Sequence, residues 1–282
     1  MALPDRDRLL KNMRVPTLPA LVQRLTQLID SPDSGTAEVG ALIKEDPPLA
    51  GRVLRIANSS FYGLKEACTS IEQASTLLGL SLLRNLVVQA ALIEGQAHLK
   101  SLGLDLDLLW HRSALTGRIS AMLSRKAHCP LLPSPDEAYL TGLLHDIGQV
   151  VILDNLGTEY VALHESARRQ ELPLHLAERR ELGMTHADVG AIVANAWGLP
   201  SSVRLGIEIH HGRRASDYAI PAVYLAIRSG HILERVSAGT LTAAHEPLDA
   251  AAEKQVGITP KAVAEVIEYV RGNLTLPLTD AA

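Results

Sequence analysis

The sequence predicts an all-α fold, a multi-helix bundle with an N-terminal helical subdomain. Hydrophobic residues make up 47% of the 282 residues, yet the chain holds only one Phe and two Trp, so the apolar content comes mainly from aliphatic side chains. Leu and Ala favour helices, whereas strands favour aromatic and β-branched side chains. Apolar residues recur at helical spacing, and no stretch alternates apolar and polar residues convincingly, as a half-buried strand would.

Spacing and capping signals place the first three helices. Residues 21–29 carry an apolar stripe that stops at the turn-forming residues 32–35. Thr36 is expected to cap a short helix. Asp46 is expected to cap the next one, with Pro47 in its first turn, where the missing N–H costs little.

Residues 71–89 have the outline of a helix-turn-helix. Ser70 and Gln73 form a capping box before the first helix, and Ser81 is expected to cap the second. A recognition helix must offer polar side chains to base edges, and the candidates here are Ser81, Arg84, Asn85 and Gln89. The rest of the segment is apolar and its surroundings are not basic, which argues against DNA binding.

The central helices are expected to carry the chemistry. One helix runs from about Asp107 to Leu123. Ser134 and Glu137 form a second capping box, and this box opens a helix that is expected to hold His145 and Asp146.

Further helices follow to the end of the chain. One lies around residues 161–169, and Thr185 with Asp188 caps another. Ser201 or Ser202 is expected to cap a helix that ends at residues 210–212. Two or three helices are expected beyond Pro221.

Composition narrows the classes of function. The formal net charge is −4, so no overall basic field attracts nucleic acid or an anionic membrane. Two cysteines are too few for a disulfide scaffold. The N-terminus lacks the apolar region of a signal peptide, and no apolar run approaches the roughly 20 residues of a membrane helix. We therefore expect a soluble, cytoplasmic protein that does not bind membranes.

The most informative motif is the segment from Gly142 to Gly148, which places His145 and Asp146 among apolar residues. Both residue types bind divalent metals, and a buried charge needs a partner. A hydrogen-bonded pair without metal would also satisfy both side chains. The two glycines are expected to permit close helix packing.

Seven phrases in order resemble the HDOD family, the HD-related output domains of bacterial signalling. They are Leu18-Pro19, Glu45–Leu49, Val53–Ser59, Leu77–Leu80, Gly142–Gly148, Thr185–Gly190, and Trp197–Pro200 leading to His210-His211. The resemblance implies an HD-like bundle. It divides the chain into a leader (1–13), an HDOD domain (14–212, with an N-terminal helical part 14–100 and an HD-like part 101–212) and a C-terminal helical extension (213–282).

Metal-dependent relatives of this family surround divalent metals with His and Asp side chains. The resemblance implies that the corresponding residues here are His145, Asp146, His186, His210 and His211. Without metal, His186 would simply lie in a first helical turn, and the paired histidines would complement a helix C-terminus.

Two ligand positions of the relatives are lost in this sequence. The first should be a His, but the position holds Arg112, which has no lone pair for a cation. His111 is one residue earlier, about 100° around the helix. The last ligand should be an Asp, but our register places Ile227 there, ten residues beyond Asp217.

The resemblance therefore implies a non-catalytic regulatory module with an eroded HD metal site, acting through protein–protein contacts and without a cofactor. Its partners would be signalling proteins such as a receiver, cyclase or kinase domain. Arg112, Arg213 and Arg214 are candidates for contact with a ligand or partner.

Two alternatives stay open. One is a phosphohydrolase or phosphodiesterase that uses Fe, Mn or Zn to act on a nucleotide or a cyclic dinucleotide. The other is DNA binding by residues 71–89.

Overall fold

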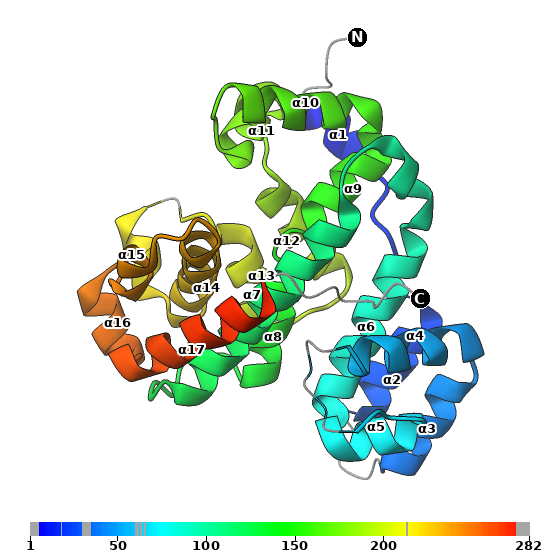
Figure 1. Cartoon of the computed structure of the whole chain (residues 1–282). Helices are drawn as coiled ribbons and strands as arrows, with labels where there is room; N and C mark the ends of the chain where they lie inside the picture. Colours follow the sequence, from blue (N-terminus) through cyan, green and yellow to red (C-terminus); the bar gives the residue numbers. More distant parts are fainter. Residues whose placement is uncertain are drawn as a thin grey trace. The chain divides into compact units, whose positions relative to one another are not determined.

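The computed structural model describes residues 6–17, 19–29, 35–59, 62, 64, 66–212 and 214–274. Every regular element in these ranges is a helix, which confirms the predicted all-α fold (Figure 1). The described residues form two compact units. The small unit contains residues 17–97, and the large unit contains residues 6–16 and 98–274. The domain limits inferred from sequence stay predictions.

The small unit is a helical bundle around α6. Its helices are α2 (Ala20–Ile29), α3 (Thr36–Lys44), α4 (Pro47–Ala57), α5 (Ile71–Leu78) and α6 (Leu80–Gly95). Helix α6 packs against α2, α4 and α5. Leu25, Ile43, Leu83 and Leu86 are fully buried and form part of its core. Burial of such side chains is the main favourable term in folding.

Capping in the small unit agrees only in part with the sequence-based predictions. Asp46 caps α4 as predicted, because its Oδ1 accepts from the Leu49 backbone N at 2.9 Å. Ser70 also caps α5, but the Gln73 side chain accepts from the Thr69 backbone N instead of closing the box. Two predicted caps are wrong, since Thr36 and Ser81 lie inside helices that begin after Gly35 and Gly79.

The large unit contains the remaining helices. They are α1 (Arg6–Asn12), η1 (Ala97–Leu102, which joins the two units in sequence), α7 (Leu106–Lys126), α8 (Pro135–Leu144), α9 (Ile147–Leu156), α10 (Thr158–Arg169), α11 (Leu174–Leu182), α12 (His186–Ala196), α13 (Ser201–Ile209), η2 (Ala215–Ala219), α14 (Pro221–Ser237), α15 (Leu241–His245), α16 (Ala250–Val256) and α17 (Pro260–Asn273). Helix α7 packs against α8, α14 and α17, and α12 packs against α9 and α13.

Two glycine contacts bring the helices of the large unit close together, as predicted. A Cβ on Gly142 would lie 2.5 Å from the backbone N of Gly117, where α8 meets α7. A Cβ on Gly148 would lie 1.9 Å from the carbonyl oxygen of His186, where α9 meets the start of α12. Only glycine allows such close backbone approach.

Three expectations for the large unit are corrected. The helix opened by the Ser134 capping box ends at Leu144, so His145 and Asp146 occupy the junction between α8 and α9. Helix α13 begins at Ser201 after Pro200, without a serine cap, and ends at Ile209. Four helices, not two or three, follow from Pro221 to Asn273.

None of the described helices combines the length and the apolar character needed to cross a membrane.

Candidate functional site

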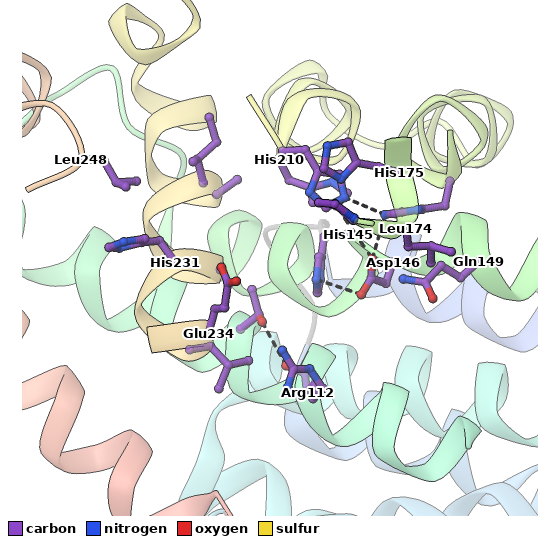
Figure 2. A pocket seen from close by; sticks show the side chains of 18 residues that line it. Arg112, His145, Asp146, Gln149, Leu174, His175, His210, His231, Glu234 and Leu248 are labelled. Atoms are coloured by element: carbon purple, nitrogen blue, oxygen red, sulfur yellow. Dashed lines mark hydrogen bonds and ion pairs between the residues drawn. The ribbon is translucent and has the colours of Figure 1, made fainter. Parts of the chain in front are cut away.

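A cavity of about 530 Å³ opens in the large unit around the His145–Asp146 junction (Figure 2). Its walls come from α7, α9, the start of α11, α12, the end of α13, and α14. Six imidazoles line it, those of His145, His175, His186, His210, His211 and His231. Five site residues inferred from sequence, His145, Asp146, His186, His210 and His211, therefore share one cavity.

Asp146 lies at the centre of the imidazole cluster. Its Oδ2 lies 3.2 Å from His145 Nε2, and its Oδ1 lies 3.2 Å from His186 Nε2. The same Oδ1 lies 3.8 Å from His210 Nε2. Because the chain changes direction at the α8–α9 junction, adjacent residues can point their side chains to one centre.

Backbone and carboxylate acceptors fix the orientation of three rings. Nδ1 of His145 donates to the Gly142 carbonyl, and Nδ1 of His210 donates to the Ile207 carbonyl, both at 2.7 Å. Nδ1 of His186 donates to a carboxylate at the same distance. A carbonyl or carboxylate can only accept, so each Nδ1 carries a proton. A ring of this kind turns its Nε2 toward Asp146, and in His186 that Nε2 also carries a proton, because it donates to the Asp146 carboxylate.

The carboxylate that holds His186 belongs to Glu178 on α11, a residue that sequence reasoning missed. Glu178 is fully buried and accepts from the ring Nδ1 of His186 at 2.7 Å and from its backbone N at 2.8 Å. The Tyr160 hydroxyl of α10 also donates to Glu178. A signal was present in the sequence, since Glu178 shares the apolar face of its helix with Leu174 and Leu182.

The charges of this cluster are strongly coupled. Burial lowers the pKa of His186, but the Glu178 charge and hydrogen bonds to Asp146 and Glu178 outweigh burial and raise that pKa to about 10. Burial acts to raise the pKa of Asp146, but the neighbouring His145 and His186 hold it well below its usual value. Burial, and then the charge of His211, keep the pKa of His210 well below the ordinary histidine value.

His211 completes the cluster at its solvent side. Its Nε2 lies 2.9 Å from the Nε2 of His186. The ring of His175, another residue missed by sequence reasoning, stacks on His211 with 4.1 Å between centroids and 17° between planes. Partial burial and the His186 charge lower the pKa of His211.

The two positions at which the sequence-based register expects ligands of metal-dependent relatives also line the cavity. Arg112 and Ile227 lie on its wall, from α7 and α14. Among the described residues, no ion pair joins Arg112 to Asp146, whose ionic contacts are all with histidines. His111 points elsewhere, since its Nε2 contacts the Leu274 carbonyl at 3.1 Å.

The other residues considered from sequence lie outside the cavity. Asp217 accepts from the Arg214 backbone N at 2.8 Å in a local turn and does not line the cavity. Arg214 is exposed and likewise does not line the cavity. Arg213 lies outside the described residues.

The helix-turn-helix segment does not present its amides for reading bases. Asn85 is 1% exposed and Gln89 is fully buried, so neither can reach a base edge. The sequence-based alternative that assigned them to DNA contact is wrong for these two residues. The reason is that α6 is buried on several faces instead of presenting one polar face to solvent.

Two sets of three ligand atoms in the described cluster lie close enough to hold a metal ion. One set is His186, His210 and His211, and the other is His145, Asp146 and His210. Imidazole nitrogen with carboxylate oxygen suits Zn²⁺, Fe²⁺ or Mn²⁺. His210 Nε2 is buried without a hydrogen-bond partner among the described residues, so the donor set fits a bound cation.

An all-α fold with a His-Asp pair at a helix junction, surrounded by imidazoles, defines a domain of the HD superfamily. The HDOD domain family matches residues 15–213 of this sequence, which is more than half of the chain. The chain belongs to the HDOD family.

Similar proteins support the fold assignment. An HDOD domain protein of unknown function from Geobacter sulfurreducens has a similar structure, with a TM-score of 0.69 and 23% identity over 94% of this chain and 95% of that one. A Marinobacter aquaeolei VT8 structure, provisionally named a signal transduction protein, has a TM-score of 0.72 and 23% identity over 96% of this chain and 59% of that one.

A relative from Treponema pallidum (strain Nichols), named as uncharacterized, is 28% identical over 197 residues, which cover 70% of this chain. The aligned region spans only 37% of that relative.

Proposed function

We propose that this protein is a non-catalytic regulatory module of bacterial signal transduction that acts by binding a protein partner. The observation that carries the proposal is the placement of Arg112 and Ile227 on the cavity wall. A two-metal hydrolytic site needs ligands on both sides of the reacting phosphate. The guanidinium of Arg112 and the alkyl side chain of Ile227 supply no metal ligand on their side of the cavity.

The family context supports a signalling role. HDOD domains are the HD-related output domains of bacterial signalling, and this chain matches their family. The structurally similar protein from Marinobacter aquaeolei VT8 is provisionally named a signal transduction protein. A receiver, cyclase or kinase domain in a partner would supply the catalytic step. The cytoplasm is the proposed location.

One observation favours a second candidate, a metal-dependent phosphohydrolase. Asp146 and the buried Nε2 of His210 face each other at 3.8 Å with no hydrogen bond between them, as two ligands of one cation would. A divalent ion held there would lower the pKa of a bound water and so supply hydroxide at neutral pH. The chain's own residues would bind and orient that ion.

Hydrolysis assays with metal-supplemented protein distinguish the regulatory module from the phosphohydrolase. We would incubate the chain with Mn²⁺, Fe²⁺ or Zn²⁺ and a panel of nucleotides and cyclic dinucleotides, beside an Asp146→Ala variant. The proposal expects the same background rate from both proteins. Turnover that the variant lacks would favour the phosphohydrolase.

In-cell crosslinking with mass spectrometry tests the partner. The proposal expects a reproducible crosslink to a signalling protein, and the same complex reconstituted from two purified proteins. A chain that crosslinks to no signalling protein would contradict the regulatory role.

A further inference from the structure

We infer that the part of the cavity next to α14 binds a small zwitterion of the amino-acid type, with its carboxylate at Arg112, its ammonium group at Glu234 and its apolar body over Gly230. The ligand would lie beside the His-Asp cluster and not within it. The inference goes beyond the proposed regulatory function, because it gives the module a small-molecule input.

One wall of the cavity lies outside the residues that match the HDOD family. Six of the lining residues lie on α14, and a seventh, Leu248, precedes α16, so all seven follow residue 213. Figure 2 shows His231 and Leu248 on one side of the view, and Asp146 and Gln149 on the other. The cavity volume of about 530 Å³ is typical of small-molecule sites, which span roughly 300–1,000 Å³. It leaves room for an organic ligand beside the cluster.

Gly230 has no packing reason to be a glycine. It lies inside α14 and lines the cavity, and a Cβ there would meet nothing within 4 Å. By contrast, a Cβ on Gly148 would lie 1.9 Å from a backbone oxygen. A glycine inside a helix destabilises it relative to alanine, and one use of glycine is to let a ligand approach the backbone closely. The open space over Gly230 is therefore a suitable place for the body of a ligand.

The α14 wall combines an apolar surface with a carboxylate. Ile227, Gly230 and Glu234 share one face of the helix, because residues three and four apart lie on the same side. The face presents an alkyl side chain, an open position and a carboxylate in that order. Leu248 adds a second alkyl side chain to the cavity lining. A ligand along this face needs an apolar body and a cationic group at the end near Glu234.

Arg112 and Glu234 line the cavity with opposite charges that no described residue neutralises. Both side chains are exposed, and neither forms an ion pair or a side-chain hydrogen bond within the described part of the chain. By contrast, His231 on the same wall contacts the guanidinium groups of Arg228 and Arg235 at 3.1 and 3.4 Å. A guanidinium binds a carboxylate through two parallel hydrogen bonds, and a carboxylate accepts from an ammonium group. A zwitterion supplies a partner to each.

The charges of the cavity argue against a polyanion. A nucleotide with several phosphates would gain from Arg112 but would bring negative charge toward Glu234 and Asp146, which line the same cavity. A carboxylate without an amine would leave Glu234 unpaired, and an amine without a carboxylate would leave Arg112 unpaired. An amino acid with an apolar side chain satisfies both charges and fills the space over Gly230.

Isothermal titration calorimetry on the full chain tests the inference with matched probes. L-leucine and L-phenylalanine are the zwitterions, 4-methylpentanoate is leucine without its amine, and 3-methylbutylamine is leucine without its carboxylate. ATP is the polyanion. We expect one molecule of leucine or phenylalanine to bind per chain. The two leucine fragments should bind at least about tenfold more weakly, because each loses one charged hydrogen bond.

Variants of the cavity wall locate the bound molecule. Arg112→Gln and Glu234→Gln should each weaken leucine binding by roughly tenfold, and Glu234→Gln should not weaken the binding of 4-methylpentanoate. Gly230→Leu should fill the space and abolish binding. Gly272→Leu on α17 is the matched control, because a Cβ there also meets nothing within 4 Å and the residue does not line the cavity. It should bind leucine as the parent protein does.

Circular dichroism would check that each variant is folded. Should Gly230→Leu fail to fold, the two charge variants still decide whether the zwitterion lies between Arg112 and Glu234. Four results would overturn the inference: no binding of either amino acid at millimolar concentration to the folded parent protein, equal binding of leucine and its two fragments, tighter binding of ATP than of either amino acid, or unchanged leucine binding in folded Gly230→Leu.

The outcome for the ligand is separable from the outcome for the proposed function. A chain that binds no amino acid but crosslinks to a signalling protein would keep the regulatory role and lose this site. A chain that binds leucine at the α14 wall but crosslinks to no signalling protein would keep the site and lose that role.

Discussion

Glu178 accepts two hydrogen bonds from His186, one from the ring Nδ1 at 2.7 Å and one from the backbone N at 2.8 Å, and both residues are almost completely buried. The contact ties α11 to the first residue of α12. It also orients the imidazole ring so that Nε2 of His186 points to Asp146. A single buried carboxylate thereby controls both the packing of two helices and the geometry of the site.

Glu178→Gln should destabilise the large unit by about 3 kcal/mol. The amide keeps the size of the side chain but removes the charge opposite His186 and turns one acceptor into a donor within a buried network. Urea unfolding followed by circular dichroism measures the change. Glu181→Gln, an exposed substitution on the same helix, should change stability by less than about 0.5 kcal/mol. Equal losses in both variants would contradict the prediction.

A second buried charge joins α14 to α16. Arg228 is fully buried, and its Nε donates to Glu253 at 3.2 Å. Glu253→Gln should cost about 3–5 kcal/mol, because the guanidinium would remain buried without a counter-charge. Glu268→Gln is the matched control, since its pair with Arg271 is exposed. If the melting temperature of Glu253→Gln falls no further than that of Glu268→Gln, water must solvate the Arg228 guanidinium in place of the lost carboxylate.

Gly148→Ala should disrupt the site through the backbone. The new methyl group would lie 1.9 Å from the His186 carbonyl oxygen, so α9 and α12 would have to separate at a cost of at least about 3 kcal/mol. Gly230→Ala is the control, because a Cβ there meets nothing within 4 Å. It should stabilise α14 by about 0.5–1 kcal/mol. Melting temperatures of Gly148→Ala and Gly230→Ala that change in the same direction would contradict this prediction.

The sequence predicts much of this fold for local reasons. Asp46 and the Ser134–Glu137 box cap helices as expected, because a cap depends on residues within one turn. The sequence also predicts the close approach at Gly142 and Gly148. The predicted cap at Ser81 is wrong, since Gly79 already starts the helix and a serine one residue inside has no cap to make.

The site was harder to predict wherever it depends on contacts between helices. The sequence identifies His145 and Asp146 as a motif but predicts a continuous helix through them, because the apolar residues around them fit one. In the structure, both residues lie in a break between α8 and α9. Glu178 and His175 come from α11, whose neighbouring arginines give it the sequence of a surface helix. The apolar face of α11 indicates that Glu178 is buried, but its contact with His186 depends on how α11 packs against the start of α12. The residue spacing within α11 does not determine that packing.

Acidification should destabilise the large unit in part through His111. Burial lowers the pKa of His111, against the opposing effect of the Leu274 carbonyl. Below about pH 6.5, His111 therefore binds a proton more readily in the unfolded chain than in the folded chain. The stability contributed by neutral His111 is complete above that pH and declines as the pH falls toward the folded-state pKa.

Urea titrations between pH 7.5 and 5 would measure this effect. His111→Gln should reduce the slope of unfolding free energy against pH, by at most about 1.4 kcal/mol per pH unit for one proton. His98→Gln provides the control, because that side chain is 62% exposed. An unchanged slope in His111→Gln would mean that other buried histidines account for the acid sensitivity.

Placing ligands at the two positions where the sequence-based register expects them should create a metal position beside Asp146. Arg112 and Ile227 line the same cavity as His145 and Asp146, so Arg112→His with Ile227→Asp would place four ligands on the empty side of the aspartate. Removing the guanidinium also removes a positive charge that opposes a cation at that position. We expect the double variant to bind one divalent ion per chain more than the parent protein.

Single variants and a register control make this last prediction specific. Arg112→His alone or Ile227→Asp alone leaves three ligands and should bind the added ion more weakly than the double variant does. Arg112→His with Ala226→Asp moves the carboxylate one residue along α14, about 100° around the helix, and should bind no more metal than the parent protein. Equal metal content in the two double variants would mean that residue 227 does not face the position of the added ion, and that the register relating this chain to metal-dependent HD proteins is wrong.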